Sequence, residues 1–382
     1  MDFRYTDEQI MVRETARDFA IKELAPGAAQ RDEDEAYPGE AIKKLGELGF
    51  MGVTVPPEYG GAGLDMISYA IIVEELARVD ASCAIILSVN NSLVCYPLEL
   101  FATHEQKLRF LKPLASGEKV GAFALTEPES GSDAGAMKAL ARREGDYYIL
   151  NGTKNFITTG ENSDLLLVFA VTNPALGSRG TSAFIVEKGR PGLRVGKKES
   201  KLGIRSSDCV SIHFEDCPIP VENRIGEEGM GFKIALNALN SGRIGVAAQA
   251  LGIAQACLDE SIAYSKVRKQ FGKPIAAFQA TQFKIARMAT EIEAARMLLY
   301  SSCHKKDRGE PFVKEAAMAK LYCSELAVRC ALEAVQIHGG YGYIKEYPVE
   351  RYLRDSKITT IYEGTNEIMH LIIAEQLLGR EI

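Results

Sequence analysis

The chain has 382 residues, of which 46% are hydrophobic and 25% charged, an ordinary balance for a soluble globular protein of two or three domains. Its 45 Lys and Arg against 51 Asp and Glu give a net charge of −6, which argues against a general nucleic-acid-binding protein. No uninterrupted apolar run reaches the roughly 18 residues of a membrane span, so we expect no membrane partner.

The cysteines and histidines do not form a recognisable metal site. None of the eight cysteines lies in a Cys-x-x-Cys pair, and none of the five histidines lies in a His-x-x-x-His pair. We interpret the cysteines as reduced core residues of a cytosol-like compartment. Met1–Tyr5 lacks the apolar core of a signal peptide. We therefore expect a cytoplasmic protein or, alternatively, a mature protein of the mitochondrial matrix.

Residues 1–120 show the pattern of a helical domain. Thr6–Gln9 and Thr103–Gln106 are capping boxes, and Asp65 is a candidate N-cap for the helix that follows it. Ala84–Phe101 contains no Lys or Arg and is predicted to be a helix buried on most sides. Its amides at 90 and 91 are either core pairs or groups that face a ligand, because buried amides need partners.

The pattern changes near residue 120 and again near residue 230. Residues 121–228 contain short β-rich runs separated by Gly, Asn, Asp and Pro, which predicts a small antiparallel β-domain. Long helical periods return over 231–265, 277–307 and 311–337, and a last apolar run covers 368–378. Four antiparallel helices predict a bundle over residues 229–382. The periodicity itself gives only the order helix, strand, helix.

Two stretches of the β-region combine a strand with a polar turn. Residues 123–133 end a strand in Thr126 and continue through a Pro turn into Gly-Ser-Asp, which exposes backbone N–H groups and hydroxyls. Residues 151–158 contain Asn-Gly, first of all a hairpin signal. Each stretch alone is equally an ordinary strand with its turn.

Three stretches of the C-terminal region carry charged or glycine-rich motifs. Arg268–Gly272 places an arginine where a helix is expected to end, and such an arginine is either a phosphate clamp or a surface residue. Gln336–Gly342 places paired glycines after a helix, as a C-cap or as a close approach to a ligand. Leu239–Arg243 lies inside a helical period.

The stretch Ile361–Ile368 reads Ile-Tyr-Glu-Gly-Thr-Asn-Glu-Ile and precedes the last apolar run. Thr365 or Asn366 is the expected cap of that helix, so Glu363 falls in the turn before it. A carboxylate shielded from water beside Tyr362 would have a raised pKa and act as a general base. The alternative is a glutamate that merely favours the helix dipole.

Together these six stretches closely resemble the acyl-CoA dehydrogenase family, and the resemblance covers about residues 3 to 380. It is closest to the short-chain, butyryl-type members, which Ser88–Leu93 also resembles. The fold class it implies is α+β: an N-terminal helical domain (1–120), a middle antiparallel β-domain (121–228) and a C-terminal four-helix bundle (229–382).

The resemblance implies FAD as cofactor. The residues that it places against FAD are Phe123, Leu125, Thr126, Gly131, Ser132, Phe156, Ile157, Thr158, Arg268, Phe271, Gln336, Gly339, Gly340, Thr365 and Glu367. Those from 268 to 340 would contact FAD held by the neighbouring subunit of a homotetramer, a dimer of dimers. His338 stands where an apolar residue is expected and receives no role.

The resemblance also implies the substrate contacts and the chemistry. The residues placed against acyl-CoA are Ser132, Asn240, Arg243, Tyr362 and Gly364. Glu363 would remove the α-proton while the β-hydrogen leaves as hydride to flavin N5, giving a trans-2-enoyl-CoA. The Glu363 backbone N–H and a flavin ribityl hydroxyl would polarise the thioester carbonyl. Some relatives carry the base at the position of Gly242, which has no side chain here.

The partner and the acyl group also follow from the resemblance. Electron-transferring flavoprotein is the implied electron acceptor. A straight short acyl chain is the first expectation. The missing side chain at Gly242 suggests room for a branched or alicyclic, cyclohexanecarboxyl-type acid as the alternative. Two other classes remain open: an acyl-CoA oxidase of the same fold, and a non-catalytic assembly or binding protein.

Overall fold

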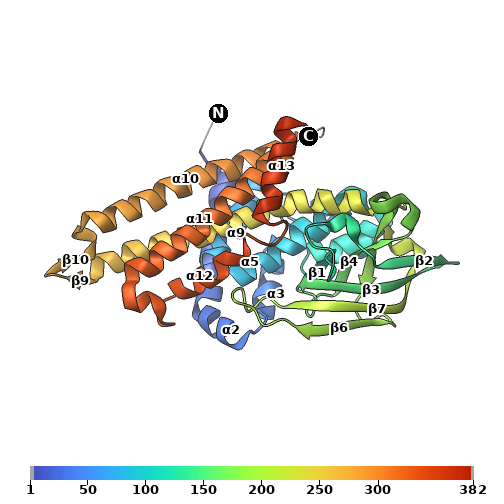
Figure 1. Cartoon of the computed structure of the whole chain (residues 1–382), viewed down its shortest axis with the longest axis horizontal. Coiled ribbons are helices and arrows are strands. Elements are labelled where there is room, and N and C mark those ends of the chain that lie inside the picture. The colour runs from blue at the N-terminus through green and yellow to red at the C-terminus, as the bar shows by residue number, and fades with distance from the viewer. Residues whose placement is uncertain (1–3, 380–382) are drawn as a thin grey trace.

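Two helical regions pack together beside a β-sheet, which lies at one end of the computed structural model; the model describes residues 4–379 (Figure 1). Residues 1–3 and 380–382 lie outside this description. The first three belong to the stretch Met1–Tyr5, in which we found no apolar core of a signal peptide. The predicted order of helices, strands and helices is confirmed.

Three of the N-terminal helices begin at caps that the sequence predicts. The helices are α1 (Asp7–Phe19), α2 (Ala28–Asp34), α3 (Gly39–Glu47), α4 (Met66–Ala77), α5 (Ala81–Ser88), α6 (Tyr96–Phe101), α7 (His104–Gln106) and α8 (Lys112–Ala115). Both predicted capping boxes form, at Thr6 with Gln9 and at Thr103 with Gln106. Asp65 accepts the Ser68 N–H at 2.7 Å and caps α4.

The apolar stretch around α5 and α6 is a core segment. One helical run in the described chain, Ala81–Phe101, is long and apolar enough to span a membrane, and 94% of its most apolar window is buried inside the protein. The amide of Asn90 donates to the Met51 and Leu114 carbonyls, and its oxygen accepts from Gly121. Asn91 is paired in the same way, so these amides are core pairs and do not face a ligand.

The middle region is a twisted eight-stranded sheet. Its strands are β1 (Gly121–Ala124), β2 (Leu140–Glu144), β3 (Tyr147–Thr158), β4 (Leu165–Val171), β5 (Thr181–Glu187), β6 (Leu193–Lys198), β7 (Cys209–Pro220) and β8 (Arg224–Ile225). The spatial order is β6-β7-β3-β2-β4-β5-β8, with β1 beside β4. Most pairs are antiparallel as predicted, but β1 and β2 run parallel to β4. The long connections before β4 allow this, whereas short hairpins would not.

The C-terminal region is built on three long helices. They are α9 (Gly231–Val267), α10 (Gln279–Asp307) and α11 (Val313–His338), followed by α12 (Val349–Ile358) and α13 (Asn366–Leu378). A short hairpin of two strands, β9 (Lys269–Gln270) and β10 (Lys273–Pro274), joins α9 to α10. The short α12 was not predicted, and it lies beside α11 on the side that faces α2 (Figure 1).

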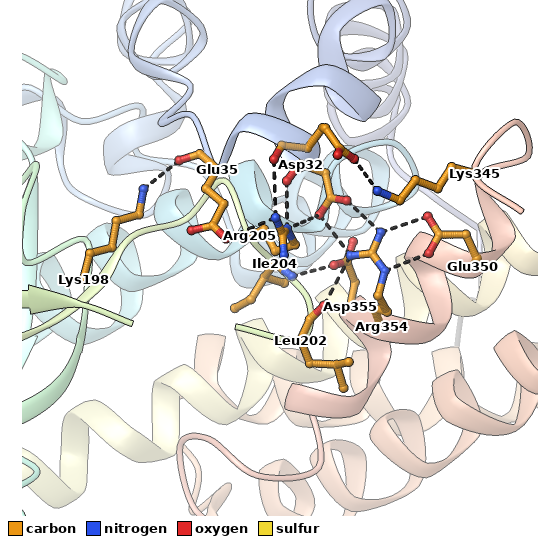
Figure 2. A network of polar contacts seen from close by, with 11 residues as sticks. Asp32, Glu35, Lys198, Leu202, Ile204, Arg205, Lys345, Glu350, Arg354 and Asp355 are labelled. Carbon is orange, nitrogen blue, oxygen red and sulfur yellow. Dashed lines mark hydrogen bonds and ion pairs between the residues drawn. The ribbon is translucent and has the colours of Figure 1, made fainter. Parts of the chain in front are cut away.

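A polar network ties the three regions together where α2, the β6–β7 loop and α12 meet, as Figure 2 shows. Arg354 of α12 binds Asp32 of α2 at 2.7 Å and Glu350 at 2.7 Å. The backbone N–H of Ile204, in the loop, donates to Asp355 at 2.5 Å. Ile204 has a φ of +44°, an unfavourable value for a β-branched residue. The network therefore holds the loop in a conformation that its sequence disfavours.

We expect Arg354→Met to lower the free energy of unfolding by about 2–3 kcal/mol, because it leaves two largely buried carboxylates without their charged donor. The matched control is Arg194→Met, whose ion pair with Glu215 is 71% exposed on both sides. Its expected loss is below about 1 kcal/mol. Chemical denaturation followed by circular dichroism measures both, and equal losses would contradict the assigned role of the network.

Candidate active site

Glu363 lies in a strained turn between α12 and α13. Its φ is +54°, and Gly364 follows at +99°. Thr365 caps α13 by accepting the Ile368 N–H at 3.4 Å, as the sequence predicts for one of two possible caps. A left-handed glutamate costs of order 1–3 kcal/mol and persists only where its surroundings fix it. This turn therefore places the carboxylate at a defined position in the interior.

The Glu363 carboxylate is buried and unpaired. Among residues 4–379, neither of its oxygens has a hydrogen-bond partner. Burial raises the pKa of Glu363 to about 7, and the charges of Arg243 and Lys320 oppose that rise. A carboxyl group that titrates near neutral pH can accept a proton from a substrate, because its ionised form is populated there.

Gly242 of α9 provides the surface on which this carboxylate packs. A Cβ at position 242 would lie 1.9 Å from Glu363 Oε2 and 2.7 Å from Leu93 Cδ2. The missing side chain therefore makes room for the base itself. It does not leave the free space for a bulkier acyl group that the sequence suggested.

Arg243 is the nearest cation on α9 and is also buried. Its Nη1 donates to Asn240 Oδ1 at 2.5 Å, so Asn240 holds the guanidinium in place. Burial lowers the pKa of Arg243 to about 10, with Glu363 opposing the change. Its Nε is buried and has no partner within residues 4–379, which leaves one charged donor beside the carboxylate.

The stretches 123–133 and 151–158 come together at one end of the sheet. Asn155 N donates to Thr126 O at 2.7 Å, which brings β3 against the turn after β1. A bulge between residues 154 and 157 interrupts β3, and within it Phe156 has a φ of +55° and is 62% exposed. Ile157 is buried and Thr158 half-buried. The bulge thus directs a phenyl ring out of the sheet beside the polar turn.

A buried ion pair between Lys154 and Glu127 joins these two stretches, and it was not predicted from the sequence. Lys154 is fully buried, and its Nζ donates to Leu125 O at 2.9 Å and to Glu127 Oε1 at 2.7 Å. Glu127 also accepts the backbone N–H groups of Lys138 and Ala139. Every group is hydrogen-bonded, which a buried pair requires. The available signal was a lysine and a glutamate inside otherwise β-type stretches.

The remaining predicted residues gather at the far end of the bundle. Arg268 follows α9, and Phe271 lies at the tip of the β9–β10 hairpin with a φ of +51° and 93% of its surface exposed. Arg243 and Arg268 are 25 residues apart along α9. At about 1.5 Å per residue, this separation is about 38 Å. One chain therefore does not bring the two ends of the candidate site together.

A cavity of about 480 Å³ lies at this far end, between α9, α11 and the hairpin. Arg268, His338, Gly339 and Gly340 line it. His338 Nδ1 lies 2.8 Å from the Ala334 carbonyl and donates its hydrogen to it, so Nε2 is an acceptor. Nε2 is buried and unpartnered among residues 4–379, and His338 is only 3% exposed.

These features fit a dinucleotide cofactor. A Cβ at Gly339 or Gly340 would meet nothing within 4 Å, so the backbone there is open to close approach. Arg268 supplies a charge suited to phosphate, and it has no carboxylate partner in the described chain. The Gly131 position in the β-domain is equally open. Among residues 4–379, no group of three or more His, Cys, Asp or Glu side chains is arranged to hold a metal ion.

The structure separates the predicted residues into three groups. The base group holds Tyr362, Glu363, Gly364, Asn240 and Arg243. The sheet group holds Phe123, Leu125, Thr126, Gly131, Ser132, Phe156, Ile157 and Thr158. The distant group holds Arg268, Phe271, Gln336, Gly339 and Gly340. Thr365 serves as a helix cap, and Glu367 is an exposed acid in the first turn of α13.

The fold and this site define a protein of three regions with a buried carboxylate, unpaired among the described residues, and an open cavity beside an arginine. Three family models match the chain: the N-terminal (residues 6–118), middle (122–217) and C-terminal (229–378) domains of acyl-CoA dehydrogenase. The chain belongs to the acyl-CoA dehydrogenase family and is an oxidoreductase of that class. The predicted α+β architecture and family are confirmed.

The similarity covers the whole chain. An acyl-CoA dehydrogenase of Bacillus subtilis is 52% identical over 98% of this chain and 99% of the relative. The structure of butyryl-CoA dehydrogenase from Megasphaera elsdenii is 49% identical, with a TM-score of 0.98 over 99% of this chain and 100% of that one. A chain in a structure on the electron-transferring flavoprotein of Acidaminococcus fermentans and flavin-based electron bifurcation is 51% identical (TM-score 0.98; 99% and 100% covered).

The cofactor follows from the family, whose members depend on FAD. One solved relative, an FAD complex of PigA, is 35% identical with a TM-score of 0.95 over 99% of each chain. The prediction of FAD as cofactor is confirmed.

We expect Gly242→Ala to reduce turnover by about 10²-fold, because the new methyl group occupies the place of Glu363 Oε2 and displaces the base by an ångström or more. Folding should be little affected, since the contacts at 242 are the ends of two flexible side chains. Initial rates and thermal unfolding of the FAD-loaded variant measure the two effects. Full turnover in this variant would contradict the packing described for the base.

Proposed function

We propose that the protein is a FAD-dependent dehydrogenase of short-chain acyl-CoA thioesters, with Glu363 as the base that removes the α-proton. The observation that carries this proposal is the buried Glu363 carboxylate, which has no hydrogen-bond partner within residues 4–379 and a pKa raised to about 7. FAD supplies the hydride acceptor at N5, so the β-hydrogen leaves with its electron pair while the α-proton goes to Glu363.

The chain's own residues prepare this reaction. Arg243 is buried and held by Asn240, and we assign it the contact with the CoA part of a substrate. The Glu363 backbone N–H is the donor we assign to the thioester carbonyl, which must be polarised to acidify the α-carbon. Tyr362 is hydrogen-bonded to the buried Gln249, so its ring is a fixed wall beside the base.

We expect Glu363→Gln to keep FAD and acyl-CoA binding and to lose at least about 10²-fold in turnover, the lower range for a general base. The substitution removes the proton acceptor with almost no change in volume. Flavin absorbance and equilibrium binding of the acyl-CoA establish that the site is intact, and steady-state rates give the loss. Near-normal turnover would exclude Glu363 as the base.

We propose a homotetramer, a dimer of dimers, in which one subunit completes the FAD site of another. The distance between the base group and the distant group along α9 supports this arrangement. Apolar side chains that no other part of the described chain covers support it too. Phe271 on the hairpin and Leu371, Leu377 and Leu378 on α13 are examples.

Light scattering should show a tetramer with one FAD per chain. We expect Arg268→Ala to weaken FAD retention, because the lost guanidinium is a phosphate contact from a second subunit. The control is Arg308→Ala, another exposed arginine of the same domain that pairs only with Glu310 among the described residues. A stable monomer that retains FAD fully, or equal FAD loss in both variants, would overturn the proposed assembly.

Electron-transferring flavoprotein is the acceptor that we propose for the reduced flavin. Support comes from the similarity to the Acidaminococcus fermentans chain described above. An acyl-CoA oxidase would instead pass electrons to oxygen. Peroxide formed in air at the full rate of turnover would assign that alternative.

The proposed acyl group is a straight chain of about four to six carbons. We take this range from the relatives, since a hydrophobic pocket distinguishes chains that differ by one methylene only weakly. Two polar side chains around the base are already paired. Tyr69 OH lies 2.8 Å from Ser88 Oγ, and Gln249 donates to the Ala81 carbonyl at 2.8 Å. Neither offers a free donor to a terminal carboxylate, and the Nε of Arg243, unpartnered within residues 4–379, lies beside Glu363, so burying such a carboxylate there is costly.

One further cation does approach this region. Lys306 of α10 donates to Ser241 Oγ at 2.5 Å and lies 3.7 Å from the centre of the Tyr96 ring. Burial lowers its pKa to about 8. Because both contacts already engage the ammonium, we still expect dicarboxylic acyl chains to be poor substrates.

Bleaching of the flavin by a panel of thioesters tests this specificity. We expect the highest kcat/KM for butyryl-CoA or hexanoyl-CoA, lower values for isobutyryl- and cyclohexanecarboxyl-CoA because the space at Gly242 is filled, and the lowest for glutaryl-CoA. The panel is run with electron-transferring flavoprotein as acceptor. A preference for glutaryl-CoA, or for chains beyond about ten carbons, would refute this description of the pocket.

A further inference from the structure

Lys320 is a fully buried lysine, at 0% exposure, on the face of α11 beneath the Glu363 turn. Its Nζ donates to the Gly364 carbonyl at 2.8 Å and to Asn366 Oδ1 at 2.9 Å. Burying an ammonium group is costly unless its surroundings compensate. None of the six motifs includes this residue, and the family resemblance gave it no role.

The two acceptors of Lys320 lie at the end of the strained part of the turn and at the start of the helix that follows it. Gly364 follows Glu363 directly, and Asn366 begins α13. Asn366 Oδ1 also accepts from Ser324 Oγ at 3.1 Å, and the Asn366 N–H donates to Thr360 O at 3.0 Å. Lys320 therefore holds the carbonyl next to the left-handed glutamate, whereas Ser324 only strengthens the anchor at Asn366.

Lys320 and Glu363 also act on each other through their charges. Burial lowers the pKa of Lys320 to about 7, and Glu363 opposes this change. The other charged or titratable groups around the pair are Arg243 from α9, Tyr69 from α4, Tyr362 from the turn, Glu325 from α11 and Glu367 from α13. Of these, Arg243 is the second cation that lowers the pKa of Glu363.

We propose that Lys320 is a positioning residue for the base. It fixes the turn that carries Glu363, and its positive charge favours the ionised form of that carboxylate. The proposal rests on the proposed role of Glu363 as the base. It assigns two separable effects to one side chain, because the hydrogen bonds hold the turn and the charge acts on the carboxylate.

The test compares Lys320→Met with the control Ser324→Ala in the FAD-loaded protein. The methionine variant removes the charge and both hydrogen bonds at nearly constant length. The alanine variant weakens the anchor at Asn366 without changing any charge. The readout is the acidic limb of the kcat/KM profile against pH, where the base loses activity by protonation.

We expect the acidic limb of the unmodified protein near pH 7 and that of Lys320→Met at least about one pH unit higher, the low end for loss of a neighbouring opposite charge. Below the limb, this shift is a further tenfold loss of kcat/KM. Ser324→Ala should leave the limb in place. A folded Lys320→Met protein with an unmoved limb would overturn the proposal, and so would an equal shift in Ser324→Ala.

Two further measurements keep the outcome decisive. Should Lys320→Met fail to fold, Lys320→Gln retains two N–H donors while removing the charge, and the same shift is expected of it. Infrared difference titration of the Glu363 carboxyl, with Glu363→Gln as the blank, follows the same equilibrium without turnover. If Glu363→Gln keeps its turnover, the proposed base is wrong. If that variant is inactive but the infrared titration does not shift without Lys320, only the role of Lys320 is wrong.

Discussion

A carboxylate buried without hydrogen bonds, like that of Glu363, costs more free energy than a protein of ordinary stability can absorb unless its environment compensates. Here the compensation comes at a distance. Arg243 and Lys320 lower its pKa, but each has its own partners, Asn240 for the arginine and the Gly364 and Asn366 oxygens for the lysine. Because neither cation forms a hydrogen bond with the carboxylate, its lone pairs are unoccupied within the described chain, as the proposed role of a base requires.

Backbone strain is concentrated at the same places. Among residues 4–379, seven non-glycine residues have positive φ, and three of them, Phe156, Phe271 and Glu363, belong to the predicted site. A buried lysine lies close to two of them. Lys154, two residues before Phe156, donates to the Leu125 carbonyl, and Lys320 donates to the carbonyl of Gly364, which follows Glu363. Such strain costs about 1–3 kcal/mol per residue. The two lysines are thus part of what makes an unfavourable backbone conformation the stable one.

Features of this fold that depend on neighbouring residues could be predicted from the sequence. Features that depend on contacts between distant residues could not. Both capping boxes, the Asp65 cap and the three long helices could be predicted because they depend on neighbouring residues. The parallel pairing of β1 with β4 and the place of α12 depend on tertiary contacts that no local pattern reports. Lys320 could have been noticed, since it shares a helical face with the buried Ala316, Cys323 and Ala327. A lysine in such a row is normally assigned to the surface.

The length of α9 keeps the two ends of the candidate site apart within one chain. The helix carries Gly242 and Arg243 near its start and leads to Arg268 at its end, and its hydrogen-bonded ladder fixes their separation at about 38 Å. No rearrangement within one chain can bring these residues to a single ligand while the helix stays intact. At the far end, Phe271 is exposed in a left-handed conformation, and the buried His338 Nε2 has no hydrogen-bond partner among residues 4–379. In the proposed tetramer, a second copy places this far end beside the base group of a different subunit. The rigid length of α9 is the physical reason why we propose that two chains share one cofactor site.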